Sequence, residues 1–309
     1  MLTQIKGLHH VTSLASSAQA NNDFFTRTLG LRRVKKTVNF DAPNVYHLYY
    51  ADAAGTPGTV MTYFPFEGAR RGRAGTGEAS LTAFSVPPGS LPAWKTRLAE
   101  LGVAGLSQDS LFDQSRLLFR GPDGEGFALV EAEDDRPGWA GNGVAKSMAI
   151  HGFHSVTLRL ADATATIALL QFMGYREIAR QGAFTRLALD SGNGADRIDI
   201  ETVDAPAAGQ GAGSVHHVAF AVETREMQLE VRKALAEAGQ DVTPVIDRDY
   251  FWAIYFRSPG GVLFEVATNE PGFDRDEDIE HLGEALKLPR QHAHLRETLE
   301  RKYLSPIKD

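Results

Sequence analysis

The pattern of apolar, polar and glycine positions repeats four times along this chain of 309 residues. Each repeat has a helix-like stretch that ends in an apolar residue followed by glycine, which supplies a left-handed cap that other residues adopt only at a cost. The capping glycines lie 72, 72 and 65 residues apart, at Gly30, Gly102, Gly174 and Gly239. An internal period of this kind indicates repeated structural modules. The predicted helices are Ser17–Leu29, Ser90–Leu101, Asp162–Met173 and Thr224–Ala238.

Strand-like patterns surround each predicted helix. An alternating apolar run precedes the helix, β-branched and aromatic runs follow it, and a Gly- and Pro-rich turn leads into a last strand. Each repeat therefore predicts one strand, one helix and three further strands. The predicted first strands are Leu8–Leu14, Leu81–Val86, Phe153–Leu160 and Val215–Val222.

A single βαβββ module cannot bury both faces of its own sheet, so the modules are expected to pair. We predict an α+β protein in which four βαβββ modules form two domains. Modules one and two are predicted over 1–134, and modules three and four over 149–270. A stretch rich in Gly, Asp and Pro, 135–148, is the predicted linker. Residues 271–309 break the repeat and are predicted to form a tail with a helix near Arg290–Tyr303.

Two identical histidine doublets lie on equivalent first strands, His9-His10 in module one and His216-His217 in module four. Neighbouring side chains on a strand point to opposite faces, so we expect one member of each doublet to face a site and the other to face away. The remaining modules lack the second histidine, because Leu81 and Ser155 align with that position.

A carboxylate, Glu265, lies within the otherwise apolar last strand of module four. An unpaired buried carboxylate is unfavourable, and a bound metal is one way to offset its charge. Aligned on the same turn, module one has Tyr63 and module two has Ala128, neither of which is a good ligand, and a slip of one residue in this alignment is possible. Pairing module one with module four would bring His10, His217 and Glu265 together. Two imidazoles and one carboxylate with open positions are typical of non-haem Fe(II) sites, although Zn(II) or Mn(II) would accept the same ligands.

Composition narrows the class of protein. The chain has 32 basic and 39 acidic residues, a net charge of −7, and therefore lacks the basic excess typical of nucleic-acid binding. The absence of cysteine excludes disulfides, thiolate metal sites and cysteine nucleophiles. The first residues lack the apolar run of a signal peptide, and no stretch approaches the roughly 18 apolar residues of a membrane span. We expect a cytoplasmic protein that binds neither nucleic acid nor membrane, and a homo-oligomer is compatible with the sequence.

Several motifs resemble those of the vicinal oxygen chelate superfamily, which includes glyoxalases, bleomycin resistance proteins and dioxygenases. Within it, the chain is most similar to ring-cleaving dioxygenases related to hydroquinone 1,2-dioxygenases, and the similarity extends over nearly its whole length. The motifs are Gly7–Thr12, Tyr46–Asp52, Gly55–Thr62, Gly152–Ser155, His216–Val222, Arg257–Glu265, Gly272-Phe273 and Asp276–Asp278.

The resemblance implies paired βαβββ modules, with modules one and four sharing the catalytic site. It implies Fe(II) bound by His10, His217 and Glu265, an aromatic substrate of the hydroquinone or catechol type, and O₂ as the second substrate. It further implies that five residues line the pocket or move protons in it. These residues are His9, Thr12, His216, Arg248 and Tyr255.

Three alternatives remain open at this point. One is a glyoxalase-like isomerase or thiol transferase that uses zinc, nickel or manganese, although such sites usually have a second carboxylate where this chain has Tyr63. Another is a non-catalytic protein that binds or sequesters a small molecule, which would not need the two histidines and the glutamate. For His9 and His216, a structural role that faces away from the site is the alternative to a role in the pocket.

Overall fold

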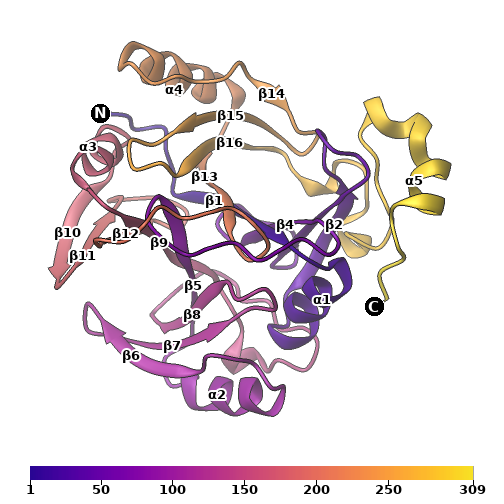
Figure 1. Cartoon of the computed structure of the whole chain (residues 1–309), viewed down its shortest axis with the longest axis horizontal. Coiled ribbons are helices and arrows are strands. Elements are labelled where there is room, and N and C mark those ends of the chain that lie inside the picture. The colour runs from indigo at the N-terminus through magenta and orange to yellow at the C-terminus, as the bar shows by residue number, and fades with distance from the viewer. Residues whose placement is uncertain (309) are drawn as a thin grey trace.

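Two curled eight-stranded sheets form the framework of the computed structural model, which describes residues 1–308 (Figure 1). The first sheet has the strand order β14-β15-β16-β13-β1-β4-β3-β2. It therefore combines the strands of module one with those of module four. Its strands are β1 (Leu8–Ala15), β2 (Arg32–Val38), β3 (Tyr46–Ala51), β4 (Val60–Pro65), β13 (Val215–Val222), β14 (Ile246–Asp247), β15 (Phe251–Arg257) and β16 (Leu263–Pro271).

The second sheet has the order β10-β11-β12-β9-β5-β8-β7-β6 and combines modules two and three. The sheets thus join the outer modules to each other and the inner modules to each other, and they do not follow successive halves of the chain. The predicted boundaries at residues 134 and 148 stay predictions. The strands of this sheet are β5 (Glu78–Val86), β6 (Ser107–Leu111), β7 (Gln114–Arg120), β8 (Gly126–Glu131), β9 (Gly152–Leu160), β10 (Arg176–Gln181), β11 (Phe184–Ala188) and β12 (Arg197–Thr202).

One helix follows the first strand of each module, as the repeat predicts. The four glycines that follow these helices all have positive φ, between 68° and 104°, as a left-handed cap requires. The first helix continues as a π-helix over Phe24–Thr28. The α+β fold of four βαβββ modules is therefore confirmed. The module helices are α1 (Ala18–Asp23), α2 (Leu91–Glu100), α3 (Thr164–Phe172) and α4 (Arg225–Glu237).

Apolar side chains form one large core that joins both sheets and the helices. A second apolar cluster lies within the first sheet and includes Tyr49, Phe251 and two residues of the tail, Phe273 and Leu282. The tail therefore packs against the first sheet, and it ends in a 3₁₀-helix (Arg290–Leu295) followed by α5 (Arg296–Lys302). None of the helices in the described chain has the length and apolar character needed to span a bilayer.

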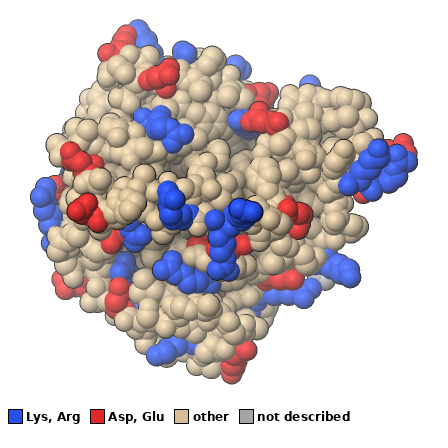
Figure 2. Space-filling view, in the orientation of Figure 1, with Lys and Arg blue, Asp and Glu red and all other residues tan. Residues whose placement is uncertain are grey.

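Charged side chains of both signs are interspersed over the face shown in Figure 2, and basic ones gather near its centre. In Figure 1 the centre of this face is crossed by the loops that join β4 to β5 and β12 to β13. Bridges between Arg71 and Ala212 and between Arg73 and Gly209 hold these two loops together. The loops thus connect the two sheets beyond the shared core.

A buried ion pair attaches the tail to the first sheet. Lys35 on β2 is fully buried, and its Nζ lies 2.7 Å from Asp276 Oδ1 and 2.5 Å from Glu277 Oε2. The ammonium group also lies 4.8 Å from the centre of the Tyr250 ring. Removing one partner of a buried pair leaves the other charge without compensation, which is strongly destabilising.

Replacing Lys35 with Met should therefore lower the free energy of unfolding by about 3 kcal/mol. Urea denaturation followed by tryptophan fluorescence measures this change. The matched control is Lys233→Met, because Lys233 pairs with Glu237 at 3.9 Å while both side chains are largely exposed. Its effect should stay below about 0.5 kcal/mol. Equal effects of the two substitutions would contradict the role given to the buried pair.

Candidate metal centre

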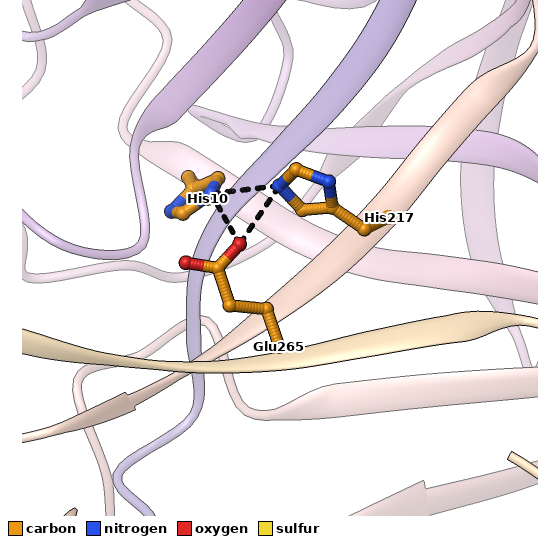
Figure 3. Close-up of side chains that lie close together, drawn as sticks. All are labelled: His10, His217 and Glu265. Atoms are coloured by element: carbon orange, nitrogen blue, oxygen red, sulfur yellow. Dashed lines mark hydrogen bonds and ion pairs between the residues drawn. The ribbon is translucent and has the colours of Figure 1, made fainter. Parts of the chain in front are cut away.

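Three potential metal ligands converge on the inner side of the first sheet (Figure 3). The Nε2 atoms of His10 and His217 are 3.1 Å apart, and Glu265 Oε2 lies 2.9 Å from His217 Nε2 and 3.4 Å from His10 Nε2. All three residues are buried, with exposures of 1%, 4% and 0% for His10, His217 and Glu265. Among residues 1–308, no other three His, Asp or Glu side chains bring their ligand atoms within 4.8 Å of one another.

The strand register explains this convergence. The antiparallel pairing of β1 with β13 sets His10 beside Ala219, and the parallel pairing of β13 with β16 sets Ala219 beside Glu265. His217 lies two residues before Ala219 and therefore points to the same face. Three strands thus deliver one ligating side chain each to a single point.

The first histidine of each doublet lies at a β-bulge. The register between β1 and β13 shifts at His9, and it shifts again at His216. A bulge sets two residues of one strand opposite one residue of its partner and redirects a side chain. The bulges interrupt simple alternation at both doublets: His216 lines the cavity beside His217, whereas His9 does not line it.

Each bulged histidine contacts its ligating neighbour through the Nδ1 atoms. His9 Nδ1 lies 2.9 Å from His10 Nδ1, and His216 Nδ1 lies 2.8 Å from His217 Nδ1. His9 Nε2 lies 3.1 Å from the carbonyl oxygen of Thr268, which can only accept, so this nitrogen carries the proton. Burial, reinforced by His10, lowers the pKa of His9 to about 3, so the ring is neutral.

A neutral His9 that donates from Nε2 must accept at Nδ1, so His10 donates from Nδ1. The Nε2 atom of His10 is then left with a free lone pair, as a metal ligand requires. The same contact between His216 and His217 leaves His217 Nε2 unprotonated when His217 is the donor. Both doublets can therefore present Nε2 lone pairs to one ion.

The group fits a divalent metal. Burial acts to raise the pKa of Glu265, but His10 and His217 outweigh it and hold that pKa well below its usual range. Neither carboxylate oxygen has a hydrogen-bond donor of suitable geometry among residues 1–308. Ligand atoms about 2.1 Å from one ion are separated by roughly 3.0 Å at octahedral angles and 3.4 Å at tetrahedral angles. The observed separations of 3.1 and 3.4 Å lie in this range, and the third, 2.9 Å, is 0.1 Å below it.

A cavity of about 510 Å³ opens directly onto these three residues. Of the predicted pocket residues, His216, Arg248 and Tyr255 line this cavity. Arg248 Nε donates to the Tyr255 hydroxyl at 3.2 Å, and Tyr255 pairs with Glu265 across β15 and β16. Burial, reinforced by Glu265, raises the pKa of Tyr255 well above 10, so the phenol stays protonated. His9 and Thr12 lie behind the wall of the cavity.

The lining residues that the sequence analysis missed include a histidine and a tyrosine on β3, His47 and Tyr49. Both lie in the Tyr46–Asp52 motif and are two positions apart on one strand, so their shared face was a signal that could have identified them. The alignment of Tyr63 with Glu265 was wrong by one position. The residue in the equivalent register is Thr62, whereas Tyr63 points to the opposite face and lies in the core. Turn-based alignment cannot detect a slip of one residue, which exchanges the two faces of a strand.

Known proteins share both the sequence and the fold. A family model described as the Glyoxalase/Bleomycin resistance protein/Dioxygenase superfamily matches residues 170–266. MhqE of Bacillus subtilis (strain 168), named as a candidate ring-cleaving dioxygenase, is 43% identical over 92% of this chain and 93% of its own. The chlorohydroquinone/hydroquinone 1,2-dioxygenase of Sphingobium indicum is 35% identical over 98% of both chains. The chain belongs to the ring-cleaving dioxygenases of this superfamily.

Structural comparison agrees with this membership. The crystal structure of a candidate dioxygenase from Bacillus subtilis subsp. subtilis str. 168 matches with a TM-score of 0.95 and 38% identity, covering 99% of this chain and 98% of that one. Glyoxalase I from Zea mays, at 13% identity, has a TM-score of 0.64 over 85% of this chain and 92% of its own, which shows a shared fold alone. The predicted fold and the predicted class of enzyme are confirmed. Dioxygenases of this family depend on a metal, and the His-His-Glu group is present in this chain.

The contact between His9 and His10 predicts a defect in metal binding. His9→Leu removes the acceptor that holds the proton on His10 Nδ1, and affinity for Co(II) or Zn(II) should fall by about 10- to 100-fold. Competition with a chelating dye measures this affinity. His154→Leu is the matched control, because His154 is the corresponding residue of β9 and bonds Ser155 Oγ at 3.2 Å. Equal metal affinity in the two variants would refute the role of His9.

Proposed function

We propose that this dioxygenase opens the ring of a hydroquinone- or catechol-like phenol with one Fe(II) bound by His10, His217 and Glu265. The observation that carries the proposal is the buried His-His-Glu group at the base of an aromatic-walled cavity. Two histidines and one carboxylate leave coordination positions open, a ligand set that suits non-haem Fe(II) oxygen chemistry. Mn(II) or Zn(II) would fit the same ligands, so metal analysis belongs to the test.

The cavity suits one substituted aromatic ring. Its volume of about 510 Å³ lies within the usual range for small-molecule sites. Apolar side chains from several elements form its walls, and Phe251 packs 5.0 Å from the ring of His10. The Sphingobium relative is named for chlorohydroquinone and hydroquinone, which supports phenols with two para hydroxyls as the first substrates to try. The apolar wall residues are Leu14, Phe40, Phe64, Phe66, Phe251 and Leu263.

The bound ion would supply Lewis-acid and redox chemistry, a lower pKa for a phenol hydroxyl and a path for electrons from the ring to O₂. Arg248 carries a permanent charge and can stabilise negative charge that develops on the ring oxygen. Tyr255 remains a hydrogen-bond donor at neutral pH. Burial, reinforced by His217, lowers the pKa of His216 to about 4 and keeps its ring neutral. With Nδ1 accepting from His217, His216 can donate a hydrogen bond from Nε2. Ring opening then incorporates both atoms of O₂ into the product.

Oxygen consumption tests the proposal. Protein purified anaerobically and loaded with Fe(II) should consume one O₂ for each hydroquinone, and mass spectrometry should show a product heavier than the phenol by O₂. His10→Ala and Glu265→Ala should lower the rate by about 100-fold or more, because loss of a metal ligand has a larger effect than loss of a side chain that only orients one. Ser155→Ala, the position in β9 that corresponds to His10, should leave the rate unchanged.

Other outcomes would overturn the proposal. A protein that retains zinc or nickel, consumes no O₂ with any phenol and isomerises a hemithioacetal would be a glyoxalase-like enzyme. A chain that binds no divalent metal would rule out the site itself. The cytoplasmic location and a homo-oligomeric assembly stay predictions, as do the roles of His9 and Thr12.

A further inference from the structure

Four equivalent positions surround the site, and three of them are occupied by His10, His217 and Glu265. The fourth position, called here the unligated corner, carries no metal ligand. Modules one and four are related by an approximate twofold axis that exchanges His10 with His217. In module four, Ala219 pairs with Glu265; in module one, Thr12 pairs with Thr62. Thr62 on β4 therefore holds the position that corresponds to Glu265.

The same symmetry relates two tyrosines. Tyr255 on β15 pairs with Glu265, and Tyr49 on β3 pairs with Thr62. Each phenol contacts a basic side chain that also lines the cavity. Tyr255 accepts from Arg248, and the Tyr49 hydroxyl lies 2.8 Å from His47 Nδ1. The cavity is thus flanked by two comparable polar pairs, of which Arg248 and Tyr255 were expected and His47 and Tyr49 were not.

A continuous hydrogen-bonded column supports the second pair. His47 Nε2 lies 2.8 Å from Thr62 Oγ1, which lies 2.8 Å from Thr12 Oγ1. Both hydroxyls of this column are fully buried, and His47 and Tyr49 are 7% and 1% exposed. The Thr62 hydroxyl thus bonds both His47 and Thr12. The column therefore holds His47 and Tyr49 rigidly at the edge of the cavity.

The charge states of the pair are defined by their surroundings. Burial lowers the pKa of His47 well below its usual value, and His10, His217 and Arg248 lower it further. Burial raises the pKa of Tyr49 well above 10, and Glu265 raises it further. Both groups are therefore neutral near pH 7. When Tyr49 donates to His47 Nδ1 and His47 Nε2 donates to Thr62, the phenol oxygen still has a lone pair free to accept.

We propose that Tyr49, held by His47 and Thr62, accepts a hydrogen bond from the substrate hydroxyl at the unligated corner of the metal group. The inference rests on the proposed function, because it concerns the same phenol in the same cavity. A ring in this cavity lies between two polar pairs, with the cationic Arg248 pair on one side and the neutral Tyr49 pair on the other. Tyr49 and His47 thereby orient the substrate, and Thr62 and Thr12 are positioning residues behind them.

Tyr49→Phe tests this inference, because it removes the acceptor and keeps the ring. The dissociation constant of hydroquinone is measured anaerobically with Zn(II)-loaded protein, and kcat/KM is measured with Fe(II)-loaded protein. Loss of one neutral hydrogen bond should weaken phenol binding by about 10-fold. The value of kcat/KM should fall at least as much, while affinity for Zn(II) should be unchanged.

Two further variants distinguish a specific loss of phenol binding from general damage to the fold. Tyr50→Phe removes a hydroxyl from the adjacent residue of β3, which lies in the core, and should leave both phenol measurements unchanged. Thr62→Val breaks the column behind His47 and should weaken phenol binding in the same direction. Wild-type phenol binding in Tyr49→Phe, or equal weakening in Tyr50→Phe, would overturn the inference. Absence of O₂ uptake by the wild-type protein would instead overturn the proposed function.

Discussion

The structure is organised around a buried carboxylate, Glu265, that has no hydrogen-bond donor of suitable geometry among residues 1–308. Glu265 is fully buried, and its Oε2 atom lies 2.9 Å from His217 Nε2 and 3.4 Å from His10 Nε2. An ionised carboxylate in such a place is highly unfavourable without a cation. The contact of His9 with His10 adds to this requirement, because the proton on His10 Nδ1 leaves a lone pair at Nε2. The contact of His216 with His217 does the same when His217 is the donor. A metal ion satisfies all three ligands together.

The second sheet meets the same constraint in a different way. Asp199 pairs with Thr157 in the register that Thr62 and Glu265 have in the first sheet. Its carboxylate is fully buried, and Arg186 binds it through Nε at 2.7 Å and Nη2 at 2.9 Å. The bidentate guanidinium supplies an internal positive charge. One duplicated framework thus contains a site open to a metal in one sheet and a closed ion pair in the other.

Much of this arrangement could be predicted from the sequence, because it depends on local patterns. The repeated helix and glycine signals identified four modules, and the histidine doublets with Glu265 identified the candidate ligands. The details that failed depend on pairing between strands. Neither the bulges at His9 and His216 nor the register that selects Thr62 over Tyr63 has a local signal. His47 and Tyr49 share one face of their strand in the sequence pattern, but the pairing of β3 with β4 is needed to place that face at the cavity.

The central claim is that one metal ion is bound by His10 Nε2, His217 Nε2 and Glu265. The most direct test is a crystal structure of the protein loaded anaerobically with Fe(II), with anomalous data collected on both sides of the iron absorption edge. We expect one iron peak for each chain, within bonding distance of these three side chains and of no fourth protein ligand. A peak at another group of residues, coordination through Nδ1 of either histidine, or no peak at all would contradict it.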